Sequence, residues 1–569
     1  MYESLVDHFS YKPLKPGKSR ARDEEEAMES EQPSLPPSRA SEADIKMKEM
    51  PEQQTWKPTT GQLMVMVSMA ISSLMVALDA TILVSVLPTL AVDLNGTAAM
   101  AFWTGTSYLL THAVLQPFIA SLSDIFGRRE LLIPSITFFA VGSIICGAAG
   151  NFTTMLAGRV VQGVGGAGII TLSQIIFADM VPLRFRPKYF NFVLGAWAVG
   201  SLLGPLIGGA FVEKATWRWC FYLNLPICGV ALPMAFFFVR LTVPATDLKT
   251  KLQSVDWIGN IFFIGGLTLF LIAISWAGIQ YEWSDWQTIL PLLLGIIVLV
   301  LTIVYEVWFA KKPFLTKSIF SSHSAIASYV VAMFQGLCLY MVLYYSTFYF
   351  ASEHFFSPIR TGVSILPATV LLLPGSAIVS GLITRFGKFR WAVWAGWTIS
   401  TLASGLYLLW DEKTSTPVWA VCECLFGLGM GMILSSVNFS IQAVVEPEDA
   451  GQAAAMYAFM RSIGMTLGVA IGGTVFQNLM KQELVRLGVE NAMQITKNAE
   501  SFIEQLRQLR QPGQEALLRQ NILDGYTHGF RGVWAVMTGI CALGLVVSLF
   551  IKRGNLDRAL QSRFQVRGE

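Results

Sequence analysis

The sequence has little charge. Of its 569 residues, 14% are Asp, Glu, Lys or Arg and 53% are hydrophobic, whereas typical soluble domains are roughly 25% charged. The mean hydropathy is +0.52. A soluble chain of this length would split into several domains with polar surfaces between them. Apolar runs instead recur along most of the chain, which indicates contact with lipid.

Several patterns that carry chemistry are also missing. There is no Gly-x-x-x-x-Gly-Lys-Ser/Thr pattern, so ATP is not expected to bind through a phosphate-binding loop. The apolar segments hold no cluster of His and Asp ligands and no nucleophile constellation, which argues against an integral-membrane enzyme and predicts no metal and no cofactor. No long basic stretch with interleaved aromatic residues is present, so nucleic acid is not an expected partner.

The cysteines do not suggest a disulfide framework or a zinc site. Most of them lie inside apolar segments, where they are expected to pack as small apolar residues. Cys422 and Cys424 are two positions apart, so on a helix their side chains diverge and make a poor metal pair. The seven are Cys146, Cys220, Cys228, Cys338, Cys422, Cys424 and Cys541.

Residues 1–57 differ in composition from the rest of the chain. They include the acidic run Asp23–Glu26, several Lys and Arg, and a Pro- and Ser-rich stretch around Pro33–Ser38. Low hydrophobicity and mixed charge predict a disordered tail. A cleavable signal peptide needs an apolar core near the N-terminus, and none is present. The first apolar span is therefore expected to act as the membrane signal.

Fourteen apolar segments are long enough to cross a membrane. A helix that crosses the roughly 30 Å hydrocarbon core needs about 20 apolar residues. The segments lie near residues 63–90, 101–121, 131–149, 153–178, 189–212, 219–240, 257–277, 288–309, 324–350, 362–384, 391–410, 417–440, 451–478 and 531–551. These segments predict an all-α polytopic membrane protein.

Lys and Arg are concentrated in alternate short loops, which sets the orientation of the spans. The loops expected on the inside contain Arg128, Arg129, Arg184, Arg186, Lys188, Arg240, Lys249, Lys251, Lys311, Lys312, Lys317, Arg385, Lys388 and Arg390. The intervening short loops contain Lys214, Arg218, Arg360 and Lys413. Both termini are then cytoplasmic. Asn95, in the glycosylation acceptor pattern Asn-Gly-Thr, is then outside.

Two features repeat eight spans apart. Gly200–Gly209 in the fifth span and Gly464–Gly473 in the thirteenth share the pattern Gly-x-x-x-Gly-x-x-x-Gly-Gly. Phe-Gly followed by a basic residue occurs at Phe126–Arg128, after span two, and at Phe386–Lys388, after span ten. The shift predicts two six-helix halves with two extra helices between them. Repeated halves with a substrate site between them are typical of secondary transporters.

This repeat gives the expected domain organisation. The divisions are a disordered cytoplasmic tail over 1–57, an N-terminal six-helix half over 58–240, two additional helices and a linker over 241–312, a C-terminal six-helix half over 313–555 that includes the long outer loop 479–530, and a cytoplasmic tail over 556–569.

Two segments of the N-terminal half carry recognisable motifs. The loop after span two, Ser121–Leu131, has the form Gly-x-Leu-x-Asp-x-x-Gly-Arg-Arg, with Ser121 in place of the first glycine. The fourth span, Leu156–Gly168, has Arg159 and Gln162 at the positions of a second motif.

Three further segments complete the set. They are Leu78–Pro88 in span one, Gly200–Gly209 in span five, and Trp217–Pro226 at the entry to span six. Together the motifs resemble the major facilitator superfamily, and in particular its fourteen-span drug:proton antiporter branch as found in fungi. The resemblance covers about residues 60–555 and implies the major facilitator fold.

Asp79, in span one, and Arg159, in span four, are the main candidates for proton coupling. An ionised carboxylate in a bilayer costs at least about 2.5 kcal/mol, so Asp79 is expected to face a cavity or a partner. Arg159 needs acceptors for its guanidinium. The alternatives are an Asp that packs against Ser or Thr and a structural ion pair. The resemblance favours a role for both residues in proton coupling.

Polar and aromatic residues on several spans are candidates for the substrate cavity. On span two, four polar residues recur at i+4 positions and form one stripe, which should line water or a cavity unless it serves helix–helix hydrogen bonding. An aromatic face on span nine would suit flat, apolar substrates or ordinary packing. The assigned cavity residues are Thr104, Tyr108, His112, Gln116, Gln162, Tyr340, Tyr344 and Arg461. The single polar residues Asn224, Gln335 and Asn438 are read as helix–helix hydrogen-bonding residues.

Two more groups of residues concern conformation. Asp124, Gly127, Arg128 and Asp179 lie at the inner ends of their spans, where ion pairs would form a conformational lock; positive-inside anchoring is the alternative reading. The motif of span five concerns shape, because glycines permit close helix contact and a proline kinks the helix. Its residues are Gly200, Gly204, Pro205, Gly208 and Gly209.

By this resemblance, the protein is expected to export small apolar or amphipathic compounds, such as toxins, secondary metabolites or drugs, across the plasma membrane in exchange for protons. The alternatives are transport of siderophores or basic amino acids, by uptake or into the vacuole, and a membrane receptor that does not transport. The expected partners are the substrate, protons and the lipid bilayer, and the expected state is a monomer. The vacuolar membrane is the alternative location.

Overall fold

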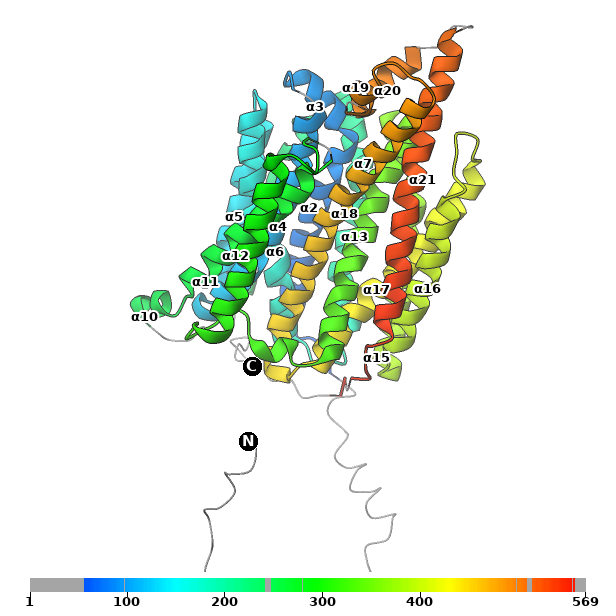
Figure 1. Ribbon diagram of the computed structural model, residues 1–569. Helices are drawn as coiled ribbons and strands as arrows, with labels where there is room; N and C mark the ends of the chain where they lie inside the picture. Colours follow the sequence, from blue (N-terminus) through cyan, green and yellow to red (C-terminus); the bar gives the residue numbers. More distant parts are fainter. Residues whose placement is uncertain are drawn as a thin grey trace, which may run out of the picture. The chain divides into compact units, whose positions relative to one another are not determined.

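The computed structural model describes residues 56–96, 98–240, 247–278, 280–497, 499–508, 514–554 and 556–557. The described residues from Pro58 onward belong to one unit, and this unit is a bundle of long helices (Figure 1). The expected N-terminal tail lies almost entirely outside the described residues, as does Thr97 of the glycosylation pattern. Asn95 itself is exposed.

Local sequence signals explain where several helices begin and end. At the start of α2, Thr59 and Gln62 form a reciprocal capping box, in which each side chain accepts a hydrogen bond from the other's backbone N–H. The Asn151 side chain caps α6 by accepting from the N–H of Thr154 at 2.9 Å. At the other end of a helix, Gly387 terminates α15 with a φ of 65°, a conformation that glycine adopts without strain.

In the described part of the chain, the N-terminal half contains six long helices and three short ones. They are α2 (Thr60–Ile82), η2 (Leu83–Ser85), α3 (Leu87–Asp93), α4 (Ala98–Phe126), α5 (Arg128–Gly147), α6 (Phe152–Met180), α7 (Arg186–Lys214), α8 (Trp219–Tyr222) and α9 (Asn224–Phe238). Next along the chain are α10 (Leu248–Gln253), α11 (Trp257–Trp276) and α12 (Trp286–Trp308).

The C-terminal half repeats this organisation. Its elements are η3 (Lys317–Phe320), α13 (His323–Ser352), α14 (Pro358–Ser364), α15 (Leu366–Phe386), α16 (Arg390–Tyr407), α17 (Thr416–Val444), η4 (Pro447–Asp449), α18 (Ala450–Arg486), α19 (Ala492–Lys497), α20 (Ala499–Gln508) and α21 (Gln514–Ser548).

The pattern of helix packing confirms the two halves. In the first half α2 packs against α7 and α9, and α6 packs against α4 and α5. In the second half α13 packs in the same way against α18 and α21, and α17 against α15 and α16. The halves meet through two equivalent pairs, α7 with α15 and α4 with α18, and also through α6 with α18 and α7 with α14. The extra helices α11 and α12 pack on each other, and α11 contacts α4 and α18.

Thirteen helices of the described residues are long and apolar enough to cross a membrane. The helix at the eleventh expected span, α16, is not among them, because Arg390 and three tryptophans lower its hydropathy. It nevertheless packs against α17 and α21 as a member of the bundle. The observed fold is therefore the predicted one, with fourteen long helices in the described part of the chain.

The long loop expected over 479–530 is largely helical. α18 continues to Arg486, and α21 already begins at Gln514. At about 1.5 Å per residue, helices of 37 and 35 residues are longer than the hydrocarbon core. Their extensions persist because they pack on each other, with Leu484 and Tyr526 fully buried. Tertiary packing stabilises helix here in a polar sequence.

Candidate functional site

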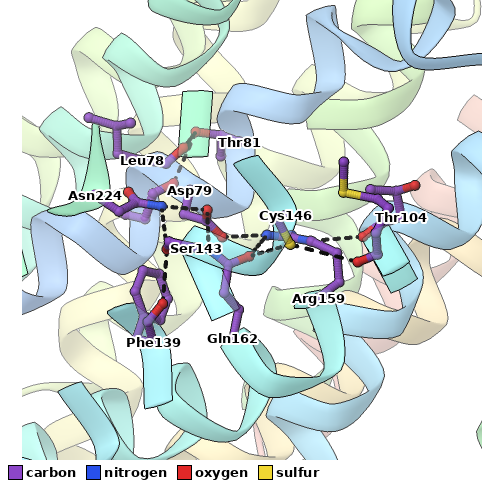
Figure 2. Close-up of polar contacts among 12 residues, drawn as sticks. Leu78, Asp79, Thr81, Thr104, Phe139, Ser143, Cys146, Arg159, Gln162 and Asn224 are labelled. Atoms are coloured by element: carbon purple, nitrogen blue, oxygen red, sulfur yellow. Dashed lines mark hydrogen bonds and ion pairs between the residues drawn. The ribbon is translucent and has the colours of Figure 1, made fainter. Parts of the chain in front are cut away.

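A buried polar network occupies the middle of the N-terminal half (Figure 2). Its centre is Asp79 of α2, which has no exposed surface. Nη1 of Arg159, on α6, donates to Oδ2 of Asp79 at 2.6 Å and to Oε1 of Gln162 at 2.7 Å. The two residues expected to act in proton coupling are therefore joined as an ion pair.

Two amides complete the shell of Asp79. Nε2 of Gln162 donates to Oδ1 of Asp79 at 3.0 Å, and Nδ2 of Asn224, on α9, donates to the same oxygen at 2.8 Å. Both amides also donate to the hydroxyl of Ser143 on α5, at 2.7 and 3.2 Å. Ser143 in turn donates to the carbonyl of Phe139 at 2.9 Å. Four helices thus hold one carboxylate.

Arg159 is fixed from a third direction by α4. Its Nε donates to the carbonyl oxygen of Thr104 at 2.9 Å, and its guanidinium carbon lies 4.3 Å from the centroid of the Tyr108 ring. A buried ion pair is stable only when the remaining donors and acceptors are also satisfied. Both oxygens of Asp79 and the Nε and Nη1 atoms of Arg159 are bonded in this network, so separating the pair would leave a buried charge without a partner.

Close helix contact brings these side chains together. A Cβ at Gly204 of α7 would lie 2.1 Å from Oγ1 of Thr81, two residues beyond Asp79 on α2. A Cβ at Gly142 of α5 would lie 2.5 Å from the backbone nitrogen of Gln162. Only glycine permits these approaches, which is the packing role expected of small residues between membrane helices.

The glycines of the span-five motif form a close contact between α7 and α2. Gly200 and Gly208 also face α2, with the carbonyl oxygens of Leu74 and Ile82 as their nearest neighbours. Pro205 lies inside α7, and its carbonyl accepts a hydrogen bond from Ser85 at 2.9 Å. The fifth motif residue, Gly209, is buried.

The polar stripe of α4 runs from the network toward the C-terminal half. The Tyr108 ring, next to Arg159, stacks on His112 with ring centroids 5.7 Å apart. Gln116 then donates to the hydroxyl of Ser462 on α18 at 3.1 Å. Thr104, at the other end of the stripe, donates its hydroxyl to the carbonyl of Met100. The stripe therefore connects the Asp79 network with α18.

The remaining cavity candidates gather on the facing helices of the C-terminal half. Tyr340 and Tyr344 of α13 stack with centroids 6.3 Å apart. Arg461 of α18 is 7% exposed, and its Nε donates to Oε1 of Gln335 at 3.1 Å. Gln162 is the exception, because it is fully buried inside the Asp79 network of the other half.

The candidate lock residues meet at the end of the bundle that carries the basic loops, which we call the basic end (Arg128, Arg184, Arg186 and Arg385). Arg128 forms ion pairs with Asp124 at 2.5 Å and with Asp179 at 3.1 Å. Asp124 also accepts a hydrogen bond from Gln452 of α18 at 2.9 Å. Gly127 joins α4 to α5 with a φ of 113°. The cluster therefore bridges the two halves.

Asn224 and Ser143 are site residues that the sequence reading did not assign. The sequence predicts that Asn224 bonds helices together, and it does so by donating to the central carboxylate. The available signal was its position in the Trp217–Pro226 motif. Ser143 has no comparable signal, because one serine in an apolar helix most often bonds to its own backbone.

The chain is similar to a known family and to known proteins. The profile of the Major Facilitator Superfamily matches residues 69–469. "MFS transporter L2" of Phoma sp. is 39% identical over 528 residues, which cover 92% of this chain and 88% of that protein. "Efflux pump FUS6" of Gibberella moniliformis is 32% identical over 529 residues, which cover 91% of this chain and 92% of that protein.

Solved structures agree on the fold. The crystal structure of the human organic anion transporter MFSD10 (TETRAN) superposes with a TM-score of 0.55 over 86% of this chain and 100% of that chain, at 14% sequence identity. At this level of identity the similarity concerns the arrangement of helices alone.

Proposed function

The chain belongs to the major facilitator superfamily, and from this premise we propose that it exports small apolar or amphipathic compounds in exchange for protons. The curated relatives named above are transporters, and one carries the name of an efflux pump. The observation that carries the proton-coupling part is the buried ion pair of Asp79 and Arg159, in which both carboxylate oxygens and the Nε and Nη1 atoms of the guanidinium are bonded within the network.

The network gives Asp79 two states with different partners. As a carboxylate it accepts from Arg159, Gln162 and Asn224. A proton on Asp79 would remove the negative charge and leave the guanidinium of Arg159 with neutral acceptors. Because a buried uncompensated charge is costly, this proton would favour a conformation in which the region is hydrated. Proton binding is thereby coupled to conformation.

The Tyr108–His112–Gln116 stripe supplies a route from this switch to the second half. Tyr108 contacts Arg159, and Gln116 contacts Ser462 on α18. A rearrangement of Arg159 would therefore be felt at the interface of the two halves. Exchange of a proton for substrate at this interface is the transport step that we propose.

The experiment is accumulation of a panel of drugs and fluorescent amphiphiles in yeast that lacks its own major pumps. Wild type is expected to lower the accumulation of some compounds. Asp79→Asn or a protonophore should abolish that effect, because each removes proton binding or its driving force. The matched control is Asp247→Asn, which alters an exposed carboxylate before α10. Surface expression of all variants must be equal.

Each rival function predicts a different result. Raised accumulation in cells with wild type would indicate uptake, as for siderophores or basic amino acids. Ligand binding with no flux in reconstituted vesicles would indicate a receptor. Export that survives both Asp79→Asn and the protonophore would contradict proton coupling. Imaging of a fluorescent fusion tests the proposed plasma-membrane location against the vacuolar membrane. The size of the purified protein in detergent tests whether it is a monomer.

A further inference from the structure

Four arginines are buried in the described part of the chain: Arg128, Arg159, Arg186 and Arg461. The first two form ion pairs with aspartates. Arg186 donates to the carbonyls of Val181 and Ala178 and to Gln442, at distances of 2.6, 2.5 and 2.7 Å. Among the described residues Arg461, like Arg186, forms no ion pair with a carboxylate, and it alone of the four has a buried guanidinium nitrogen without a hydrogen-bond partner.

The surroundings of Arg461 satisfy its guanidinium only in part. Nε donates to Gln335 at 3.1 Å, and the guanidinium carbon lies 4.4 Å from the centroid of the Trp197 ring on α7. Nη2 is buried and has no hydrogen-bond partner among the described residues. Since a guanidinium carries five donors and a full charge, burial in this form leaves a strong unmet preference for an anion.

Other unpaired polar atoms lie beside this guanidinium. Gln335, already bonded to Arg461 through its oxygen, leaves its Nε2 donor buried without a partner. On α4, Nε2 of His112 is also buried and unpartnered, and so is the hydroxyl of Tyr108, whose ring lies against Arg159. His112 is linked through Gln116 to Ser462, the neighbour of Arg461. Buried polar atoms are almost always paired, so this cluster calls for a polar ligand or water.

The chemistry of the cluster favours a ligand with a negative charge. The unpaired atoms of Arg461 and Gln335 can only donate hydrogen bonds, and the tyrosine hydroxyl and the imidazole can also donate. A carboxylate accepts several hydrogen bonds and supplies the missing negative charge, whereas a neutral group supplies only the acceptors. A cationic group would be repelled by the guanidinium.

Aromatic side chains surround this polar centre. Trp197 contributes from α7, Tyr340 and Tyr344 from α13, and Tyr457 from α18. A Cβ at Gly105 of α4 would lie 2.8 Å from the Tyr344 hydroxyl, so this tyrosine spans from one half to the other. Aromatic faces next to one guanidinium suit a molecule with a flat apolar body and one acidic group.

We infer that the exported substrates are amphipathic carboxylic acids, recognised as carboxylates by Arg461 and Gln335. This inference rests on the proposed export function and names the substrate class for it. Arg461 is the binding residue for the carboxylate, and Gln335 both orients Arg461 and donates a second hydrogen bond. The ring of Trp197 packs against the guanidinium and holds it in place.

The test uses matched pairs of fluorescent probes in sealed vesicles with an imposed proton gradient. Each pair consists of an aromatic acid and its primary amide. The acids are pyrenebutyric acid, anthracenecarboxylic acid and naphthylacetic acid. Wild type is expected to move the acids in preference to the amides. Arg461→Gln should lower the acid-to-amide ratio about tenfold or more, because a charge-assisted hydrogen bond is lost. Arg461→Lys should restore part of it.

Two controls separate recognition from folding. Arg385→Gln removes an exposed arginine at the basic end and should keep the wild-type acid-to-amide ratio. In detergent, pyrenebutyrate should raise the midpoint of thermal unfolding of wild type and of Arg461→Lys, but not of Arg461→Gln. Without probe, Arg461→Gln should unfold at or above the wild-type temperature, because it removes a buried unpaired charge.

The outcomes are distinct. Transport of amides and acids at equal rates, or an unchanged ratio in Arg461→Gln, would overturn the inference and leave the export function standing; hydration of the guanidinium would then account for its unpaired donor. If the proton gradient drives transport of none of the probes and of none of the compounds in the wider panel above, the proposed function is overturned and this inference with it.

Discussion

At the scale of single residues, three buried carboxylates have different surroundings. Asp79 is paired with Arg159. Glu423 of α17 has the hydroxyls of Ser346 and Tyr407 as neighbours and no ion pair in the described part of the chain. Glu353, just beyond the end of α13, accepts a hydrogen bond from Thr527 at 2.8 Å. The cost of each carboxylate depends on these partners rather than on depth alone.

Glu353 predicts a pH dependence of stability. Burial, together with the nearby carboxylates of Glu412, Asp524 and Asp411, raises its pKa from 4.5 to about 8. Between these values the folded protein holds a proton that the unfolded chain has released, so stability falls as pH rises from about 4.5 to about 8. Below pH 4.5 the carboxyl group is protonated in both the folded and the unfolded chain, so the stability contributed by its raised pKa is fully present.

The measurement is the midpoint of thermal unfolding at several pH values. Wild type should lose stability between pH 5 and pH 8 relative to Glu353→Gln, because the amide does not titrate. The variant keeps an acceptor for Thr527, so its fold should persist. Parallel curves for the two proteins would show that Glu353 is not the group responsible.

Residue identity predicted part of the site and missed part. Asp79 and Arg159 were recognisable, because charged residues in apolar spans are costly and need a reason. That they pair with each other could not be read from the sequence, since eighty positions separate them. Asn224 and Ser143 were not predicted as site residues, because isolated polar residues are common in membrane helices and do not by themselves indicate a site.

At the scale of helices, the small residues of α7 determine how closely α2 can approach. Gly204→Ala is expected to destabilise the protein by about 1–3 kcal/mol, because the new methyl group would overlap Thr81 and the backbone of Ile82. The readout is the midpoint of thermal unfolding in detergent. Export should fall as well, since the same contact positions Asp79.

The matched control is Gly265→Ala on α11. A Cβ there would meet no atom within 4 Å. Alanine has the higher helix propensity, so this variant should be as stable as wild type or slightly more stable. Equal losses at the two positions would mean that helix propensity or lipid contact, and not close packing, decides the effect.

Helix boundaries show where sequence reading reaches its limit. The first expected span, 63–90, is a single apolar run, but α2 ends at Ile82 and a separate α3 begins at Leu87, with a proline in its first turn. The thirteenth and fourteenth spans extend well past their apolar segments. Mean hydropathy reports how much of a helix lipid could cover, and not where packing lets it continue or break.

At the scale of the whole bundle, the basic end is closed between the halves. Gln452 contacts Asp124, and Arg186 contacts Gln442. The cavity between α4 and α18 at this end, lined by Ser121 and Asp124 among others, has a volume of about 20 Å³. That is room for about one water molecule. Substrate cannot enter from this end unless the halves separate.

Arg128→Gln is expected to open the basic end more often, because it removes the cation that Asp124 and Asp179 share. The check is labelling of Ser121→Cys by a maleimide in inside-out vesicles, which should be several-fold faster in the Arg128→Gln background. Native cysteines give little background, since all are buried except Cys424, which is partly exposed.

The comparison variant is Arg385→Gln, whose arginine is exposed at the same end. It lowers the positive charge by the same amount and should leave the labelling rate unchanged. If both variants accelerate labelling equally, the cluster acts through net positive charge at the membrane surface, and the lock interpretation is wrong.

The sequence by itself determined the membrane class, the halves and their repeat. Apolar length and the spacing of Gly200–Gly209 against Gly464–Gly473 are local properties, and lipid imposes helices on any such segment. Only the tertiary structure decided which polar groups meet. Asp79 gained its arginine and two amides from two other helices, α6 and α9, while Arg461 was left without a counter-ion among the described residues. Pairing depends on how helices far apart in the sequence are packed, and no single span encodes that.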